Sequence, residues 1–86
     1  MREEHIGKVT HFWPKAGAAQ VELDEGRPLH VGDKLRVVGH GHDFVQMVDS
    51  IEIEHESKTE GWPGEPVAIA TKQPVHANDV VFRIVE

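Results

Sequence analysis

Short runs of β-branched and aromatic residues, each ended by a glycine, proline or aspartate turn signal, extend along the whole chain. The runs alternate apolar and polar residues, and none shows the 3.6-residue spacing of an amphipathic helix. They predict six strands, at residues 6–13, 19–23, 34–38, 44–55, 66–70 and 80–85. Because an open sheet leaves unpaired edges, we expect an all-β fold, a small closed antiparallel six-stranded β-barrel that forms a single domain over residues 1–86.

The run at residues 44–55 is the longest of the six, and its apolar residues change phase along it. Phe44 and Val48 share one parity whereas Ile51 and Ile53 share the other, so a flat strand would expose one of these pairs. A β-bulge near residues 49–50 would turn both pairs inward and bend the strand, and this is the preferred interpretation. In the alternative, residues 45, 47, 51 and 53 face inward together and the phenylalanine lies over a loop.

The connections between the runs carry recognisable turn chemistry. Gly32-Asp33 suits a tight turn, because glycine accepts a positive φ and aspartate bonds nearby amides, and Asn78-Asp79 repeats the same pattern. Residues 39–43 are expected to form a loop. Residues 57–65 are polar and rich in helix breakers, and we expect them to form a turn over one end of the barrel.

Length and composition restrict the class of protein. A chain of 86 residues forms one domain with a thin core, because at this size only about 60–65% of the unfolded surface is buried. There is no cysteine, and no apolar run approaches the roughly 18 residues that a membrane helix needs. The N-terminus leads directly into a strand-like run. We therefore expect a cytoplasmic protein with no membrane association, no disulfide and no thiolate metal site.

Charge and aromatic residues indicate where a partner would bind. Fifteen acidic and nine basic side chains give a net charge of −6, which disfavours broad binding to a phosphate backbone unless the basic residues gather on one face. The residues that would form such a stacking and phosphate-contacting patch are Trp13, with its neighbour Phe12, and Lys8, Lys15 and Arg36. Trp62 in its Trp-Pro turn is predicted to cover an open end of the barrel or, alternatively, to anchor a protein partner.

Clustered histidines suggest a second kind of site. His40, His42 and Asp43 offer imidazole and carboxylate ligands for zinc, nickel or copper, with His30 or His55 as conceivable further ligands. The alternative is that His40 supports the loop by hydrogen bonding and His42 is solvated. No serine or threonine has a nucleophile signature around it, and Glu52 and Glu54 suit a solvated strand edge. We expect a protein that is not an enzyme and needs no cofactor.

Several short motifs resemble the second, β-barrel domain of translational GTPases such as elongation factor Tu. They are more similar still to small translation elongation factor-like proteins and to the C-terminal barrel of collagenase-like peptidases linked to RNA modification. The motifs cover about residues 5 to 86 and are Ile6-Gly-Lys-Val, Leu29-x-Val-Gly-Asp-x-Leu, Gly39-His-x-x-Asp-Phe, Val48-x-Ser-Ile-Glu-Ile, Pro63-Gly-Glu-x-Val and Asp79-Val-Val-Phe.

The resemblance implies a barrel of the translation-protein second-domain type that helps to bind RNA or the ribosome. The phosphate loop Gly-x-x-x-x-Gly-Lys-Ser/Thr is absent from the sequence, so we expect no bound nucleotide. The expected function is a non-catalytic binding module, an accessory to translation or RNA modification that docks on an RNA-containing or protein partner. A histidine-based metal-binding protein is the alternative, and a small hydrolase is a third one.

Overall fold

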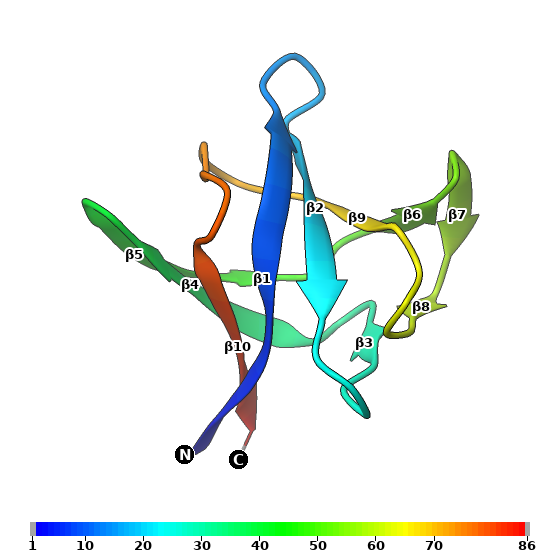
Figure 1. The fold of residues 1–86 in the computed structure, drawn as a ribbon, viewed down its shortest axis with the longest axis horizontal. Coiled ribbons are helices and arrows are strands. Elements are labelled where there is room, and N and C mark those ends of the chain that lie inside the picture. The colour runs from blue at the N-terminus through cyan, green and yellow to red at the C-terminus, as the bar shows by residue number, and fades with distance from the viewer. Residues whose placement is uncertain (1, 86) are drawn as a thin grey trace.

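The computed structural model describes residues 2–85, so the two end residues of the expected domain, Met1 and Glu86, lie outside the described residues. These residues form ten strands, shown in Figure 1. The strands are β1 (Arg2–Trp13), β2 (Ala18–Leu23), β3 (Leu29–His30), β4 (Lys34–Gly39), β5 (His42–Met47), β6 (Ile51–Ile53), β7 (Glu56–Lys58), β8 (Glu60–Gly61), β9 (Val67–Ala70) and β10 (Val80–Val85). None of the described residues forms a helix long and apolar enough to cross a membrane.

Eight of the strands form one antiparallel sheet in the order β5-β4-β10-β1-β2-β9-β6-β7, and β3 pairs with β8 in a separate two-stranded sheet. The expectation of an all-β fold is therefore confirmed, but the expected closed six-stranded barrel is wrong. Among the described residues neither sheet closes on itself, and β5 and β7 remain the edges of the large sheet. The sequence runs at 29–30 and 56–61 were too short and too polar to be recognised as strands.

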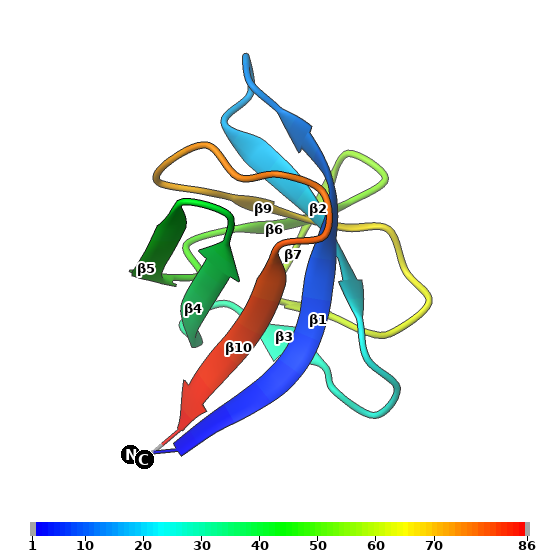
Figure 2. The same cartoon turned by 60° about the vertical axis from the view of Figure 1, so that its left-hand side comes forward.

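The large sheet nevertheless curls around its core, as the turned view in Figure 2 shows. Side-chain bonds from Gln46 on the edge strand β5 reach the far side of the curl. Its amide nitrogen donates to the carbonyl of Ala70 at 2.9 Å, and its carbonyl accepts from the amide of Lys72 at 2.9 Å. A side chain thus spans the opening where a closed barrel would have a main-chain ladder.

The core is a single cluster of buried aliphatic side chains with Phe44, and Phe12 packs against its edge. The bend of the large sheet depends on β1, whose register shifts between His5 and Gly7 against β10 and between Val9 and His11 against β2. Such irregularities increase local twist and bend a strand. The register shifts therefore lie on β1, whereas a single β-bulge was expected near residues 49–50.

The run at residues 44–55 is two strands, not one. Phe44 and Val48 are buried, and so are Ile51 and Ile53, which confirms the predicted change of phase at residues 49–50. The change is made by a break in the strand: β5 stays with β4, whereas β6 pairs with β7 and β9. The expected strand also ends early, because residues 54 and 55, at φ 52° and 68°, form a two-residue hairpin turn.

Three turns in the chain share one hydrogen-bonding pattern, at residues 30–33, 62–65 and 76–79. In each, the amide of the first residue donates to the carboxylate of the fourth at 2.8–2.9 Å, and the fourth amide donates to the first carbonyl at 3.1 Å. The third residues all have positive φ, and they are Gly32, Gly64 and Asn78. The prediction that Asn78-Asp79 repeats Gly32-Asp33 is therefore confirmed, and the turn at 62–65 is a third copy.

Candidate functional site

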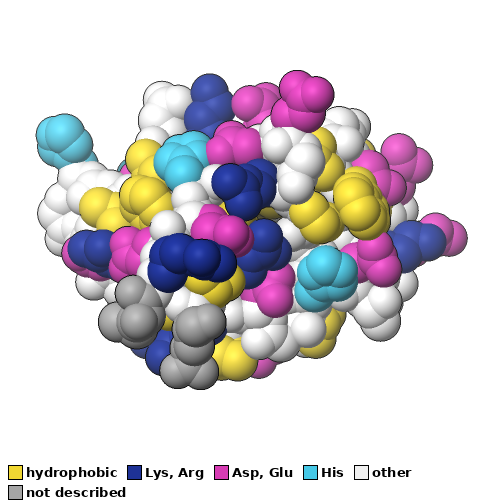
Figure 3. Space-filling model, turned by 90° about the horizontal axis from the view of Figure 1, so that it is seen from below, with side chains coloured by type: hydrophobic (Ala, Val, Ile, Leu, Met, Phe, Trp, Pro, Cys, Tyr) yellow, Lys and Arg dark blue, Asp and Glu magenta, His cyan; other side chains and the backbone are white. Residues whose placement is uncertain are grey.

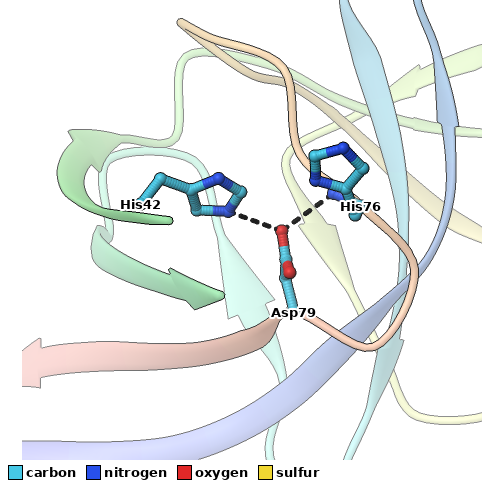
Figure 4. Close-up of side chains that lie close together, drawn as sticks. All are labelled: His42, His76 and Asp79. Carbon is cyan, nitrogen blue, oxygen red and sulfur yellow. Dashed lines mark hydrogen bonds and ion pairs between the residues drawn. The ribbon is translucent and has the colours of Figure 1, made fainter. Parts of the chain in front are cut away.

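His42 and Asp79 form the most buried ionisable pair of the described chain. His42 begins β5, Asp79 ends the turn before β10, and β4 lies between the two strands. Nε2 of the histidine lies 2.7 Å from Oδ2 of the aspartate, and their side chains are only 13% and 6% exposed. Asp79 is the one buried charged residue among residues 2–85. Figure 4 shows the two side chains pointing toward each other.

Gly39 leaves the space in which this pair meets. It is the last residue of β4 and pairs directly with His42 across the hairpin. A Cβ at this position would lie 2.0 Å from Oδ1 of Asp79 and 2.9 Å from Nε2 of His42. Both separations are shorter than van der Waals contact, so a side chain here would displace the carboxylate or the imidazole.

His76 completes a cluster with the pair. Its backbone amide donates to Oδ2 of Asp79 at 2.8 Å, and its ring stacks on that of His42, with centroids 5.8 Å apart and planes inclined by 11°. One ligand atom from each of the three side chains lies within 4.8 Å of the others. We call these three residues the HHD cluster. It offers two imidazole nitrogens and one carboxylate.

The structure places the residues predicted as metal ligands in three different settings. His42 belongs to the HHD cluster, and His40, on the β4–β5 turn, lines a hollow of about 540 Å³ together with His76 and Asp79. Asp43 follows His42 on β5, and adjacent strand residues point to opposite faces. The predicted set is therefore not brought together, and the sequence reasoning did not identify His76 and Asp79 as ligands.

Asp43 pairs with Arg36 instead. The guanidinium donates through Nε to Oδ1 at 2.8 Å and through a second nitrogen to Oδ2 at 2.5 Å. It also contacts both carboxylate oxygens of Glu3 at 3.1 and 3.2 Å. These bonds raise the pKa of Arg36, and its hydrogen bonds hold the pKa of Asp43 below the ordinary value. Arg36 is thus neutralised by two acids.

We expect Arg36→Met to return the pKa of Asp43 toward its ordinary value, because the hydrogen bonds to the guanidinium are the main cause of the lowering. Since the pKa is lower in the folded state, the pair contributes stability above the unfolded value of about 3.9 and loses it as the pH falls toward the folded value. A carboxyl ¹³C NMR titration measures this directly. Arg83→Met is the control, since Arg83 bonds to Glu4 and Asp33; an unchanged Asp43 titration in Arg36→Met would contradict the assignment.

Other basic residues are similarly engaged. Figure 3 shows arginine and lysine side chains interleaved with acidic ones on the face that it presents. The basic residues that form ion pairs with carboxylates are Arg27, Arg36, Lys58 and Arg83. The described residues therefore provide less unpaired positive charge for phosphate contacts than their number suggests.

A second candidate site is a hollow of about 520 Å³ that contains Trp13 and Lys15, two of the predicted binding residues. We call it the Trp13 hollow. Its walls come from the β1–β2 hairpin and from β6 and β9, and they include Glu52, Glu54 and His55. Trp13 is 38% exposed, and its ring meets the edge of the His11 ring at a centroid distance of 4.7 Å. The hollow combines an aromatic wall with acidic neighbours.

The remaining predicted binding residues lie apart from this hollow. Lys8 is exposed on β1, and Arg36 is held by its two acids on β4. Trp62 is 49% exposed in the turn at 62–65, where its indole nitrogen donates to Glu60. It is not among the side chains packed against the core. About half of its surface is therefore covered and half faces solvent, and the interpretation of Trp62 as a cover over the core stays a prediction.

Comparisons with known proteins find similarity to one protein named as a protease and to the C-terminal domain of a peptidase. No protein-family model matches it. An uncharacterized protease of Methanocaldococcus jannaschii is 29% identical over 86 residues, which are 99% of this chain and 21% of that protein. The chain thus spans about a fifth of the length of this relative.

Two crystal structures have closely similar folds. Both are of the C-terminal domain of a putative U32 peptidase from Geobacillus thermoleovorans. One has a TM-score of 0.84 at 21% identity and covers 95% of this chain and 93% of that domain. Its selenomethionine variant has a TM-score of 0.82 at 22% identity and covers 91% and 96%. At these identities the match shows a shared fold. It supports the collagenase-like peptidase part of the resemblance and gives no support to a translation-factor identity.

Proposed function

We propose that the chain is a non-catalytic accessory module that binds a protein segment in the Trp13 hollow. The observation that carries the proposal is the position of Trp13, a half-exposed indole in the wall of a hollow between two sheet segments. Tryptophan is enriched among the few residues that supply most of the binding energy at protein interfaces. The similarity between the fold of this chain and that of the C-terminal domain of a peptidase supports an accessory role.

Charge favours a partner segment that is apolar and basic. Glu52 and Glu54 border the hollow and Lys15 is the one lysine or arginine in its lining, while the whole chain carries −6. Acidic side chains next to an apolar wall attract a segment that presents a lysine or arginine beside a large apolar side chain. The same acids repel a phosphate backbone. A role in translation or RNA modification would therefore act through a protein partner at this surface.

The partner would be part of a peptidase or of the substrate that the peptidase acts on. This narrower proposal rests on the relatives, in which the matched segment is about a fifth of a protease or a C-terminal domain of a peptidase. An appended domain that binds protein would hold a substrate near a catalytic domain or fix the position of that domain. The HHD cluster is not needed for this role.

We expect Trp13→Ala to reduce binding of apolar-basic peptides about tenfold or more, because truncation removes the aromatic wall of the hollow. The measurement is binding of this chain to a peptide array graded in apolar and basic content, followed by fluorescence anisotropy titration of the strongest peptides. Trp62→Ala is the matched control, since it removes the other exposed tryptophan, which is 49% exposed against 38% for Trp13 and lies outside the hollow. Glu52→Lys should lower the affinity for basic peptides and leave the affinity for neutral peptides unchanged.

Two results would overturn the proposal. The first is equal peptide affinity for the wild-type chain and Trp13→Ala. The second is salt-sensitive binding of bulk tRNA that Trp13→Ala abolishes while no peptide binds, because this would assign the hollow to nucleic acid. The melting temperatures of both tryptophan variants show whether a loss of binding comes from the missing indole or from an unfolded chain.

A further inference from the structure

We propose that the HHD cluster of His42, His76 and Asp79 binds a divalent transition-metal ion such as Zn²⁺. The three ligand atoms come from two separate parts of the chain and already lie within 4.8 Å of one another. Imidazole nitrogen and carboxylate oxygen are common zinc ligands, and three protein ligands with a solvent position are a frequent zinc arrangement. The ion would join the β4–β5 hairpin to the turn that precedes β10.

Small side-chain rotations suffice to form the site. A tetrahedral zinc ion with bonds of about 2.1 Å holds its ligand atoms about 3.4 Å apart. Nε2 of His42 and Oδ2 of Asp79 are 2.7 Å apart and would separate by about 0.7 Å. No pair of ligand atoms is more than 4.8 Å apart, so the others would approach by at most about 1.4 Å.

The buried negative charge of Asp79 favours the binding of a cation in the HHD cluster. Its side chain is 6% exposed, and among the described residues neither lysine nor arginine forms an ion pair with it. A buried carboxylate is costly unless a positive partner and hydrogen bonds compensate it. The amide of His76 provides one hydrogen bond, and the imidazole of His42 provides a second contact. A metal ion bound by both imidazoles would supply the positive charge.

The surroundings hold the ligands and leave access to the ion. Phe44 meets the His42 ring at a centroid distance of 5.9 Å, and the absence of a side chain at Gly39 leaves room for the carboxylate of Asp79. His76 and Asp79 line the hollow of about 540 Å³ that also contains His40. His76 is exposed, and a hollow of this volume has room for a water molecule as the fourth ligand.

Two imidazoles select against hard cations. Mg²⁺ and Ca²⁺ prefer sites built from oxygen ligands, whereas zinc, nickel and copper accept nitrogen. Only His42 is shared between this cluster and the ligands expected from the sequence, so the proposed site is a different one.

The test is Zn²⁺ titration of the untagged chain by isothermal calorimetry, together with its melting temperature. We expect one bound ion, a melting temperature several degrees higher, and no effect of Mg²⁺. His76→Ala should weaken Zn²⁺ binding at least about tenfold, because it removes one of three ligands. His30→Ala is the matched control: His30 opens the equivalent turn at residues 30–33, but Asp33 there contacts Arg83.

A second variant guards against loss of the fold. His42→Gln retains an amide that can donate to Asp79 and should fold, while its Zn²⁺ affinity should fall as in His76→Ala. Equal loss of affinity in His76→Ala and His30→Ala would overturn the proposal, since it would mark diffuse binding to surface histidines. Failure of the wild-type chain to bind Zn²⁺, or unchanged affinity in both cluster variants, would do the same.

Discussion

Replacing Gly7 by alanine is expected to destabilise the chain by about 3 kcal/mol, at the upper end of the range for overpacking in a core. Gly7 is buried in β1 and pairs with Val81 on one side and Leu23 on the other. An alanine Cβ would lie 2.3 Å from the backbone oxygen of Glu22. That oxygen belongs to the main chain of β2, so relief requires the central strands to move apart. Urea unfolding followed by circular dichroism measures the loss.

Lys8→Ala is the control for this substitution. Lys8 is the next residue of β1, its side chain is exposed, and it pairs with Glu22 and Val80 in the same ladders. Its removal should change the free energy of unfolding by no more than about 0.5 kcal/mol. If Gly7→Ala were as stable as Lys8→Ala, the close approach of β1 and β2 at this point would be wrong.

The sequence predicts most of the strands and the buried positions because both depend on local periodicity. Val67 and Ile69 alternate with partly or fully exposed neighbours in β9, as expected, and the change of phase between Val48 and Ile51 is real. Whether the sheet closes into a barrel could not be predicted in this way. Alternation shows which side of a strand is buried, but it does not show that the chain leaves β4 after Met47 to pair with β9.

The HHD cluster escaped prediction for a related reason. His42 and Asp79 are 37 residues apart, and they meet because β4 pairs with both β5 and β10. Strand order is a property of the whole chain, whereas the metal ligands expected from the sequence all lie between His30 and His55. A signal was present in the repeated turn, since its acid at position 79 precedes a strand as Asp33 does. In each of the three turns, the carboxylate of the fourth residue accepts a hydrogen bond from the first amide. The other contacts of that carboxylate depend on which residues the fold brings close to it.

Asp79→Ala is expected to cost about 2–4 kcal/mol, because the carboxylate accepts hydrogen bonds from a backbone amide and an imidazole in a nearly solvent-free position. The amide of His76 would lose its acceptor, and His42 would lose its contact at the same time. Chemical denaturation of the metal-free chain, prepared with a chelator, measures this cost separately from any effect of an ion. His42→Ala and the double variant complete a cycle, in which we expect a coupling of about 1–3 kcal/mol.

Glu65→Ala tests whether the cost belongs to burial or to the turn alone. Glu65 closes the copy of the turn at residues 62–65 through the same bond to the first amide, at 2.8 Å, but its side chain is exposed. Water can replace that bond, so Glu65→Ala should cost less than about 1 kcal/mol. Equal losses in the two variants would show that Asp79 acts only as a turn residue. A larger loss in Asp79→Ala, with coupling to His42, would assign the difference to the buried pair that links β5 to the start of β10.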